Sequence, residues 1–214
     1  MVGTLADVLL KKKPYKDQLD QLFFKYVFPE FASSRGHMRA RACWVLHYYS
    51  QFMFNQEQVL SQAVHLTITA LLQDKELPVK VEAAIALQSL INYQERSHKY
   101  IEPQVKHIAL ELLAIIRETE NEDVTGVMQK LVCTFTVQLT PMAVEICQHL
   151  ATTFSQVLDT DEGSDEKAIT AMGLLNTIET LLAVMDERPE ILRLLEPTVL
   201  QVNFHKKLLI YFKL

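Results

Sequence analysis

A spacing of about 43 residues recurs along this chain, and no other feature constrains its fold as much. The segment Met38–Leu46 returns 41 residues later as Val79–Leu87, with the same order of basic, small and apolar residues. Comparable apolar stretches follow 45 and 43 residues further on, at Val124–Val132 and Lys167–Leu175. A period of this length indicates a supersecondary unit that is repeated and that buries its apolar face against the next copy.

Each of these four repeated segments is preceded by another amphipathic segment, and the preceding segments recur with the same spacing. They end at Phe28, Leu72, Ile116 and Leu158, which are 44, 44 and 42 residues apart. Two helices in each period are typical of HEAT and armadillo repeats. The sequence therefore predicts an all-α, HEAT/armadillo-like α-α superhelix of about four helical hairpins, with a partial hairpin at the N-terminus.

The predicted repeat array covers residues 1–202. Its inner helices are expected near residues 37–53, 78–93, 122–138 and 165–186. Residues 159–166 are mostly acidic, which predicts an exposed acidic loop. Residues 203–214 leave the repeat pattern for an apolar, basic tail, and the first apolar residues lack an outer partner helix. Both ends suggest a fragment of a larger scaffold.

Composition agrees with helices and narrows the possible functions. Only 5 glycines and 7 prolines occur in 214 residues, whereas sheets and tight hairpins use glycine in their turns. A net charge of −5 argues against a nucleic-acid surface, since phosphate binding needs a basic excess. No apolar run of ~18–20 residues is apparent, so no membrane insertion is expected. Three scattered cysteines indicate reduced thiols in the cytosol or nucleus.

No catalytic constellation is found in the sequence. A Gly-rich phosphate loop, an HExxH motif and a nucleophile elbow are all missing, so neither an enzyme nor a cofactor is expected. Cys133, Cys147 and His149 match no tetrahedral zinc motif, so no metal site is expected.

Four residues of the strongest repeat segments are candidates for partner binding. Trp44 is expected either to fill space between hairpins or to contact a partner peptide, since tryptophan is favoured at interface hot spots. Arg39 and Arg41 are expected either to be surface charges, with Arg39 bridging to the next repeat, or to contact a partner. Glu82 is a further candidate contact on the inner helices.

The acidic loop is the second candidate. It is expected either to be a solvated turn or to attract a basic partner through its charge, acting more on the association rate than on affinity. Its acidic residues are Asp159, Asp161, Glu162, Asp165 and Glu166.

Three segments, taken in order, resemble the middle of the importin-β superfamily and, within it, the branch of the importins seven and eight. They are Met38–His47, Leu77–Gln88 and Ile116–Asp123. The resemblance extends from about Val2 to Val202 and fails in the tail.

The resemblance implies the central part of a nuclear transport receptor, which carries cargo into the nucleus and releases it on binding the GTP form of Ran. It implies protein cargoes, with basic ones expected, Ran as a partner of the full-length receptor, and nucleoporins. It also implies residence in the cytoplasm and nucleus, with transit through the nuclear pore. The alternative is a general HEAT-repeat scaffold subunit of a constitutive protein complex.

Overall fold

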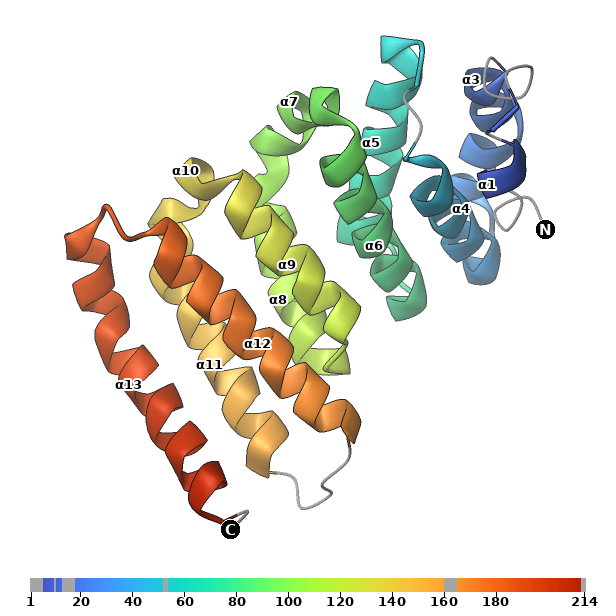
Figure 1. Cartoon of the computed structure of the whole chain (residues 1–214). Coiled ribbons are helices and arrows are strands. Elements are labelled where there is room, and N and C mark those ends of the chain that lie inside the picture. The colour runs from blue at the N-terminus through green and yellow to red at the C-terminus, as the bar shows by residue number, and fades with distance from the viewer. Residues whose placement is uncertain (1–5, 10, 13–17, 52–53, 160–164, 213–214) are drawn as a thin grey trace. The chain divides into compact units, whose positions relative to one another are not determined.

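The computed structural model describes residues 6–9, 11–12, 18–51, 54–159 and 165–212, which form helices joined by short links (Figure 1). No strand occurs among these residues. The chain divides into two compact units, residues 1–111 and 112–214. Each unit is built from helical hairpins, so the predicted all-α, HEAT-like fold class is confirmed.

The first unit holds two complete hairpins. In the first, the chain passes through α3 (Leu19–Leu22), the π-helical segment η2 (Phe23–Val27) and the 3-10 segment η3 (Phe28–Ala32), and returns in α4 (Gly36–Tyr49). The second pairs α5 (Glu57–Gln73) with α6 (Leu77–Tyr93). A single turn of helix, α1 (Ala6–Leu9), precedes them. The chain leaves through η4 (Glu95–Ser97), α7 (His98–Ile101) and η5 (Glu102–Gln104).

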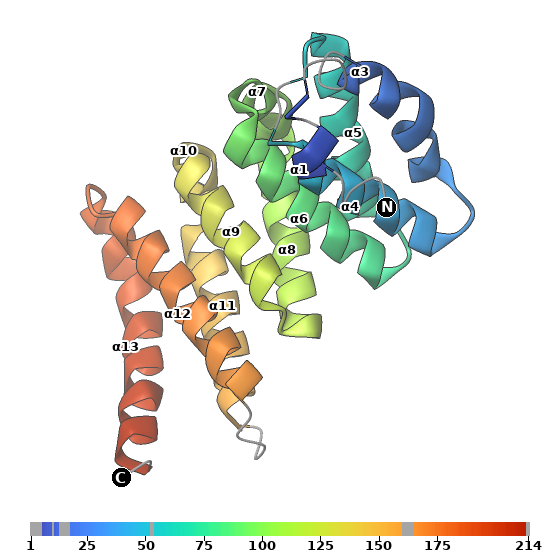
Figure 2. The same ribbon diagram turned by 45° about the vertical axis from the view of Figure 1, so that its right-hand side comes forward.

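The next helix, α8 (Val105–Thr119), begins in the first unit and ends in the second. It is followed by α9 (Glu122–Thr134), α10 (Thr136–Leu139), η6 (Thr140–Met142), α11 (Ala143–Asp159), α12 (Asp165–Val184) and α13 (Pro189–Phe212). Within the second unit, α12 packs against both α9 and α11, and α13 packs against α11 (Figure 2).

The inner helices lie close to their predicted positions, but two end early. The first, α4, ends at Tyr49 rather than near residue 53, and the Ser50 hydroxyl donates to the Leu46 carbonyl at 2.6 Å to close its last turn. The third, α9, ends at Thr134 rather than near residue 138. There the backbone of the buried Phe135 leaves the helical region, with φ −117° and ψ 40°.

Helical structure also extends into the predicted acidic loop and into the tail that was predicted to lie outside the repeats. Asp159 ends α11, and Asp165 begins α12, where acidic residues are favoured in the first helical turn. The rest of the predicted loop, residues 160–164, lies outside the described residues. The backbone of the predicted tail, residues 203–214, continues α13 as far as Phe212. After Pro197, no glycine or proline interrupts this helix.

Side-chain hydrogen bonds connect each hairpin of the first unit to the next. His47 Nδ1 lies 2.6 Å from Ser89 Oγ, Gln94 Nε2 donates to Ser50 O at 2.8 Å, and Tyr100 Oη donates to Glu57 Oε1 at 2.6 Å. These partners are 42, 44 and 43 residues apart. Because the separations match the sequence period, the repeat is visible in polar contacts as well as in the apolar core.

Asp20 makes one such link from inside the core. Its side chain is buried, and its two carboxylate oxygens accept hydrogen bonds from the backbone N–H groups of Asn55 at 3.2 Å and Gln56 at 2.7 Å. These N–H groups lie at the start of α5, where no intrahelical acceptor is available. A carboxylate of the first hairpin therefore caps the first helix of the second.

We expect Asp20→Ala to lower the free energy of unfolding by about 1–2 kcal/mol, because the substitution removes a helix cap and leaves two N–H groups at the start of α5 without their acceptor. Urea unfolding measures the loss, and hydrogen exchange should show faster exchange at the start of α5. Asp123→Ala, at an exposed position in the first turn of α9, is the matched control. Equal losses in the two variants would contradict the capping role of Asp20.

One prediction about apolar runs is wrong. Residues 167–184 of α12 are long and apolar enough to cross a membrane by length and composition. Their packing gives a different reason for this composition, since Leu174, Ile178 and Leu181 are buried against α9 and α11. An apolar helix with a covered face is typical of a hairpin core.

Candidate functional site

The inner helix α4 carries a stack of three side chains on one face. Arg41 is exposed, while Trp44 and Tyr48 are half-buried. The guanidinium carbon of Arg41 lies 4.6 Å from the centroid of the Trp44 ring, and the Trp44 and Tyr48 ring centroids are 4.5 Å apart. The Trp44 ring is half-buried and contacts an exposed arginine, and which of its two predicted roles it has stays a prediction.

Arg39 is engaged by residues of its own unit. Its Nε and Nη2 donate to the two carboxylate oxygens of Asp74 at 2.6 and 2.9 Å, and its Nη1 donates to Ser33 O at 2.9 Å. Nη2 also reaches Glu76 Oε1 at 3.1 Å. The Glu76 carboxylate lies against Gly36, where any Cβ would overlap it. Arg39 thus bridges to the next repeat, which is one of its two predicted roles. Few of its N–H donors are left for a partner.

Glu82 is half-buried on α6, and its charge acts on a thiol of α4. Burial, together with the charges of Glu82 and Asp74, raises the pKa of Cys43 to about 12. Burial also raises the pKa of Cys147 to about 11. Both thiols are therefore protonated at neutral pH, which disfavours nucleophilic chemistry at either one. A partner contact by Glu82 stays a prediction.

The predicted acidic residues fall partly on helices and partly outside the described structure. Asp159 is the last residue of α11, and Asp165 and Glu166 are the first two of α12. Asp161 and Glu162 lie outside the described residues. The backbone thus places the described members of this group where α11 passes into α12.

A second acidic group, which sequence reasoning missed, lies at the turn from α8 to α9. It consists of Glu118, Glu120, Glu122 and Asp123, and the density of four acids within six residues was the available signal. Thr170 Oγ1 of α12 donates to the Glu120 carbonyl at 2.8 Å, which fixes the start of α12 beside this turn. The two acidic groups therefore adjoin, and we call the four acids together with Asp159, Asp165 and Glu166 the acidic edge.

Two large apolar side chains are exposed on α12 next to the acidic edge. Ile169 is 47% exposed and Met172 is 56% exposed, although both belong to an otherwise well-packed inner helix. They follow Glu166 by one and two turns, on the side of the helix away from the buried Leu174 and Leu181. An acidic edge beside exposed apolar side chains can attract a partner by charge and hold it by burial.

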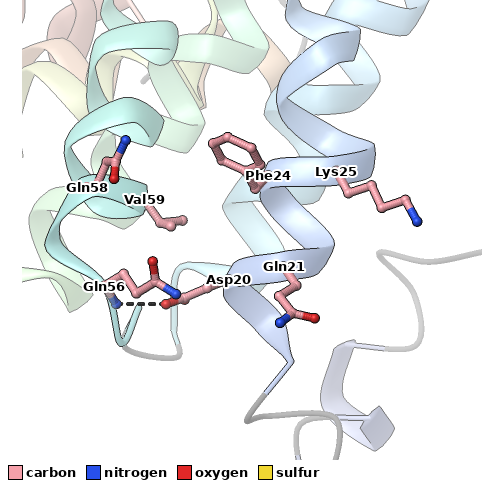
Figure 3. Close-up of a pocket in the computed structure, with 7 residues that line it drawn as sticks. All are labelled: Asp20, Gln21, Phe24, Lys25, Gln56, Gln58 and Val59. Atoms are coloured by element: carbon pink, nitrogen blue, oxygen red, sulfur yellow. Dashed lines mark hydrogen bonds between the residues drawn. The ribbon is translucent and has the colours of Figure 1, made fainter.

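The first unit also has a groove of about 540 Å³ between its outer helices, lined by Asp20, Gln21, Phe24, Lys25, Gln56, Gln58 and Val59. Phe24 extends from η2 toward Val59 of α5, whereas Lys25 points away from the gap (Figure 3). Phe24 is 58% exposed, so the groove has an aromatic wall that contacts solvent. The carboxylate of Asp20 already caps α5 and supplies no spare charge for catalysis.

Within the described residues, no group of three or more His, Cys, Asp and Glu side chains is arranged to hold a metal ion. The arrangement instead offers three surfaces for protein contacts: the arginine–aromatic stack on α4, the acidic edge with α12, and the groove at Phe24.

Comparisons with known proteins identify a set of relatives. The chain is 48% identical to importin-8 from Danio rerio and 46% identical to importin-8 from Homo sapiens, in each case over 94% of this chain and 20% of the relative. It is 36% identical to an importin beta-like SAD2 homologue from Arabidopsis thaliana over the same shares. The chain therefore spans about one fifth of the length of these relatives. No family profile and no solved structure matches it.

Proposed function

This chain belongs to the importin family, and on that premise we propose that it serves as a cargo-binding segment of a nuclear transport receptor that works with Ran. The proposed cargoes are proteins with a basic segment. Nucleoporins are proposed as further partners, with the groove at Phe24 as the surface for an apolar side chain. The proposed places of action are the cytoplasm, the nucleus and the nuclear pore in transit. No enzymatic step is part of the proposal.

The observation that carries the proposal is the acidic edge beside the exposed Ile169 and Met172. The turn from α8 to α9, which carries Glu118, Glu120, Glu122 and Asp123, lies beside α12, and Arg117 and Lys167 are the basic residues adjoining the acids in sequence. A net negative rim attracts a basic segment from a distance and speeds its association. The apolar pair then offers area that a bound segment can bury, so that specificity does not depend on charge alone.

The acidic edge can be tested in the full 214-residue chain with a fluorescent lysine- and arginine-rich peptide. The variant replaces all seven residues of the acidic edge, the aspartates by asparagine and the glutamates by glutamine. We expect its affinity for the peptide to fall by at least ~10-fold at low salt and its salt dependence to weaken, because fewer charges are screened. Fluorescence anisotropy across a salt series measures both quantities.

The matched control neutralises Asp186, Glu187 and Glu190, which are exposed between the far end of α12 and the first turn of α13. A helix of the length of α12 places them roughly 30 Å from its start. This variant removes charge from the same unit and should bind the peptide as the unchanged chain does. Unchanged affinity after neutralising the acidic edge, or an equal loss in the control, would rule out the acidic edge as the binding surface.

The alternative function is a general HEAT-repeat scaffold subunit of a constitutive protein complex. The two functions differ in their response to Ran. When this segment replaces its counterpart in a full-length importin-8, a transport receptor should release its bound cargo on adding Ran with GTP. A constitutive scaffold should keep its partner. Retention of the partner by a chimera that binds Ran normally would favour the scaffold.

A further inference from the structure

We propose that Arg41, held on the ring of Trp44, is a receptor for a carboxylate of an acidic protein segment that docks along the exposed face of α4. This inference goes beyond the proposed function, since it concerns the first unit and a partner of opposite charge to the one proposed for the acidic edge.

The geometry orients the guanidinium without a charged partner. Its central carbon stands 4.6 Å from the Trp44 ring centroid. The Trp44 ring in turn packs on Tyr48 with an interplanar angle of 52°, and Tyr48 meets His47 edge to face at 4.9 Å between centroids. These ring contacts restrict the side-chain rotation of Trp44, and the Trp44 ring in turn restricts the orientation of the Arg41 guanidinium. An arginine that is already oriented loses less freedom when it binds, which raises affinity.

The guanidinium remains available for hydrogen bonding. Among the described residues, Arg39, Arg96, Lys80 and Lys99 each form an ion pair with a carboxylate. Arg41 has no ion pair or hydrogen bond to any described residue, and its side chain is exposed. Stacking uses the flat face of the guanidinium and leaves the N–H groups at its edge free.

A free, oriented guanidinium edge matches a carboxylate. Two parallel N–H groups can donate to the two oxygens of one carboxylate, which makes this pairing stronger and more directional than a lysine contact. Arg35 is also exposed at the start of α4, and the nearby Glu76 is paired with Arg39, so the charge that is left here favours an acidic segment. A basic segment is disfavoured, because the face of Trp44 that would attract its cation is already covered by Arg41.

A protein carboxylate fits better than a nucleic acid. Binding to nucleic acid draws on many phosphate contacts, whereas this surface offers two arginines and one histidine on a chain of net charge −5. Two half-buried aromatic rings beside the arginine provide area for the apolar residues of a protein segment. The proposed occupant is therefore a peptide in which glutamate or aspartate alternates with apolar residues.

The test uses a direct optical reporter, because Trp44 is the only tryptophan of the chain. A peptide of glutamate, leucine and glycine without aromatic residues is titrated into the full chain while the emission of Trp44 is followed. We expect saturable binding with a shift in Trp44 emission. Arg41→Gln should weaken binding by ~10-fold. Arg41→Lys should weaken it by less, because lysine keeps the charge but cannot donate two parallel hydrogen bonds to one carboxylate.

Arg193→Gln, at an exposed position on α13, is the control and should leave the peptide affinity unchanged. Circular dichroism and the melting temperature should be the same in all variants, since Arg41 forms no contact that holds helices together. Absence of saturable binding, equal weakening by Arg193→Gln, or equal affinities of Arg41→Gln and the unchanged chain overturns the proposal. Preference of the Arg41 surface for a basic peptide, for a phosphopeptide without carboxylates, or for a second copy of the chain seen by sedimentation also overturns it.

Discussion

Replacing Phe23 by alanine should lower the free energy of unfolding of the first unit by about 3–5 kcal/mol. The ring is fully buried and stands edge to face with three aromatic rings, at centroid distances of 5.8 Å from Phe28, 5.7 Å from Tyr49 and 5.3 Å from Phe54. The substitution removes the transfer energy of the ring, leaves a cavity between two hairpins and breaks three edge-to-face contacts. Urea unfolding followed by circular dichroism measures the loss.

The neighbouring residue provides the matched control. Phe24 differs from Phe23 by one position, but its ring is 58% exposed in the groove at the surface. Phe24→Ala should change the free energy of unfolding by less than about 0.5–1 kcal/mol, because little area is buried and no cavity forms. Hydrogen exchange should accelerate in α3, α4 and α5 of Phe23→Ala and stay unchanged in α12. Comparable losses for the two phenylalanines would contradict the described core.

Asp74→Ala is the second substitution with a large expected effect. The Asp74 side chain is only 8% exposed and accepts two hydrogen bonds from Arg39, plus one from the Glu76 N–H at 2.9 Å. Alanine would leave the partly buried guanidinium of Arg39 without its main partner. We expect a loss of about 2–3 kcal/mol in the free energy of unfolding. Asp186→Ala, an exposed aspartate without an ion pair among the described residues, should be close to neutral.

This pair also predicts a pH dependence. Hydrogen bonding from Arg39 holds the pKa of Asp74 below its usual value in the folded chain. The folded state therefore binds fewer protons than the unfolded state, in which the aspartate titrates at about 3.9. Above that pH the pair makes its full contribution to the free energy of unfolding. As the pH falls below about 4 and through the folded pKa, the contribution is lost. The stability difference between the unchanged chain and Asp74→Ala should shrink over that range, and a constant difference down to pH 2 would contradict the pairing.

The hairpins could be predicted from sequence because their signal is local and periodic. Each helix displays its apolar residues at helical spacing, and a similar helix follows about 43 residues later. Helix ends were less predictable. The end of α9 at Phe135 depends on packing. The change from π-helix to 3-10 helix before Pro29 depends on the N–H group that proline lacks. Neither cause is visible in the spacing of apolar residues.

The candidate sites could be predicted only in part, because their roles depend on distant partners. Arg39 was a candidate for partner binding until the fold brought Asp74 to it from 35 residues away. Asp20 looks like an ordinary polar residue in an amphipathic segment, yet it caps a helix that begins at Glu57. The acidic edge needed the contact between Thr170 and Glu120, which joins positions 50 residues apart. Sequence identified the residue types, and the fold decided which of them meet.

The polar links that join neighbouring repeats have a kinetic consequence. His47 reaches Ser89, Gln94 reaches Ser50, and Tyr100 reaches Glu57, so in each case the chain closes a loop of 42 to 44 residues. The entropy of loop closure grows only with the logarithm of loop length, so successive closures of the same size meet nearly the same barrier. Low contact order of this kind favours rapid folding that starts at any formed hairpin and spreads to its neighbour. Adding repeats would then lengthen the molecule without slowing the step by which each hairpin joins it.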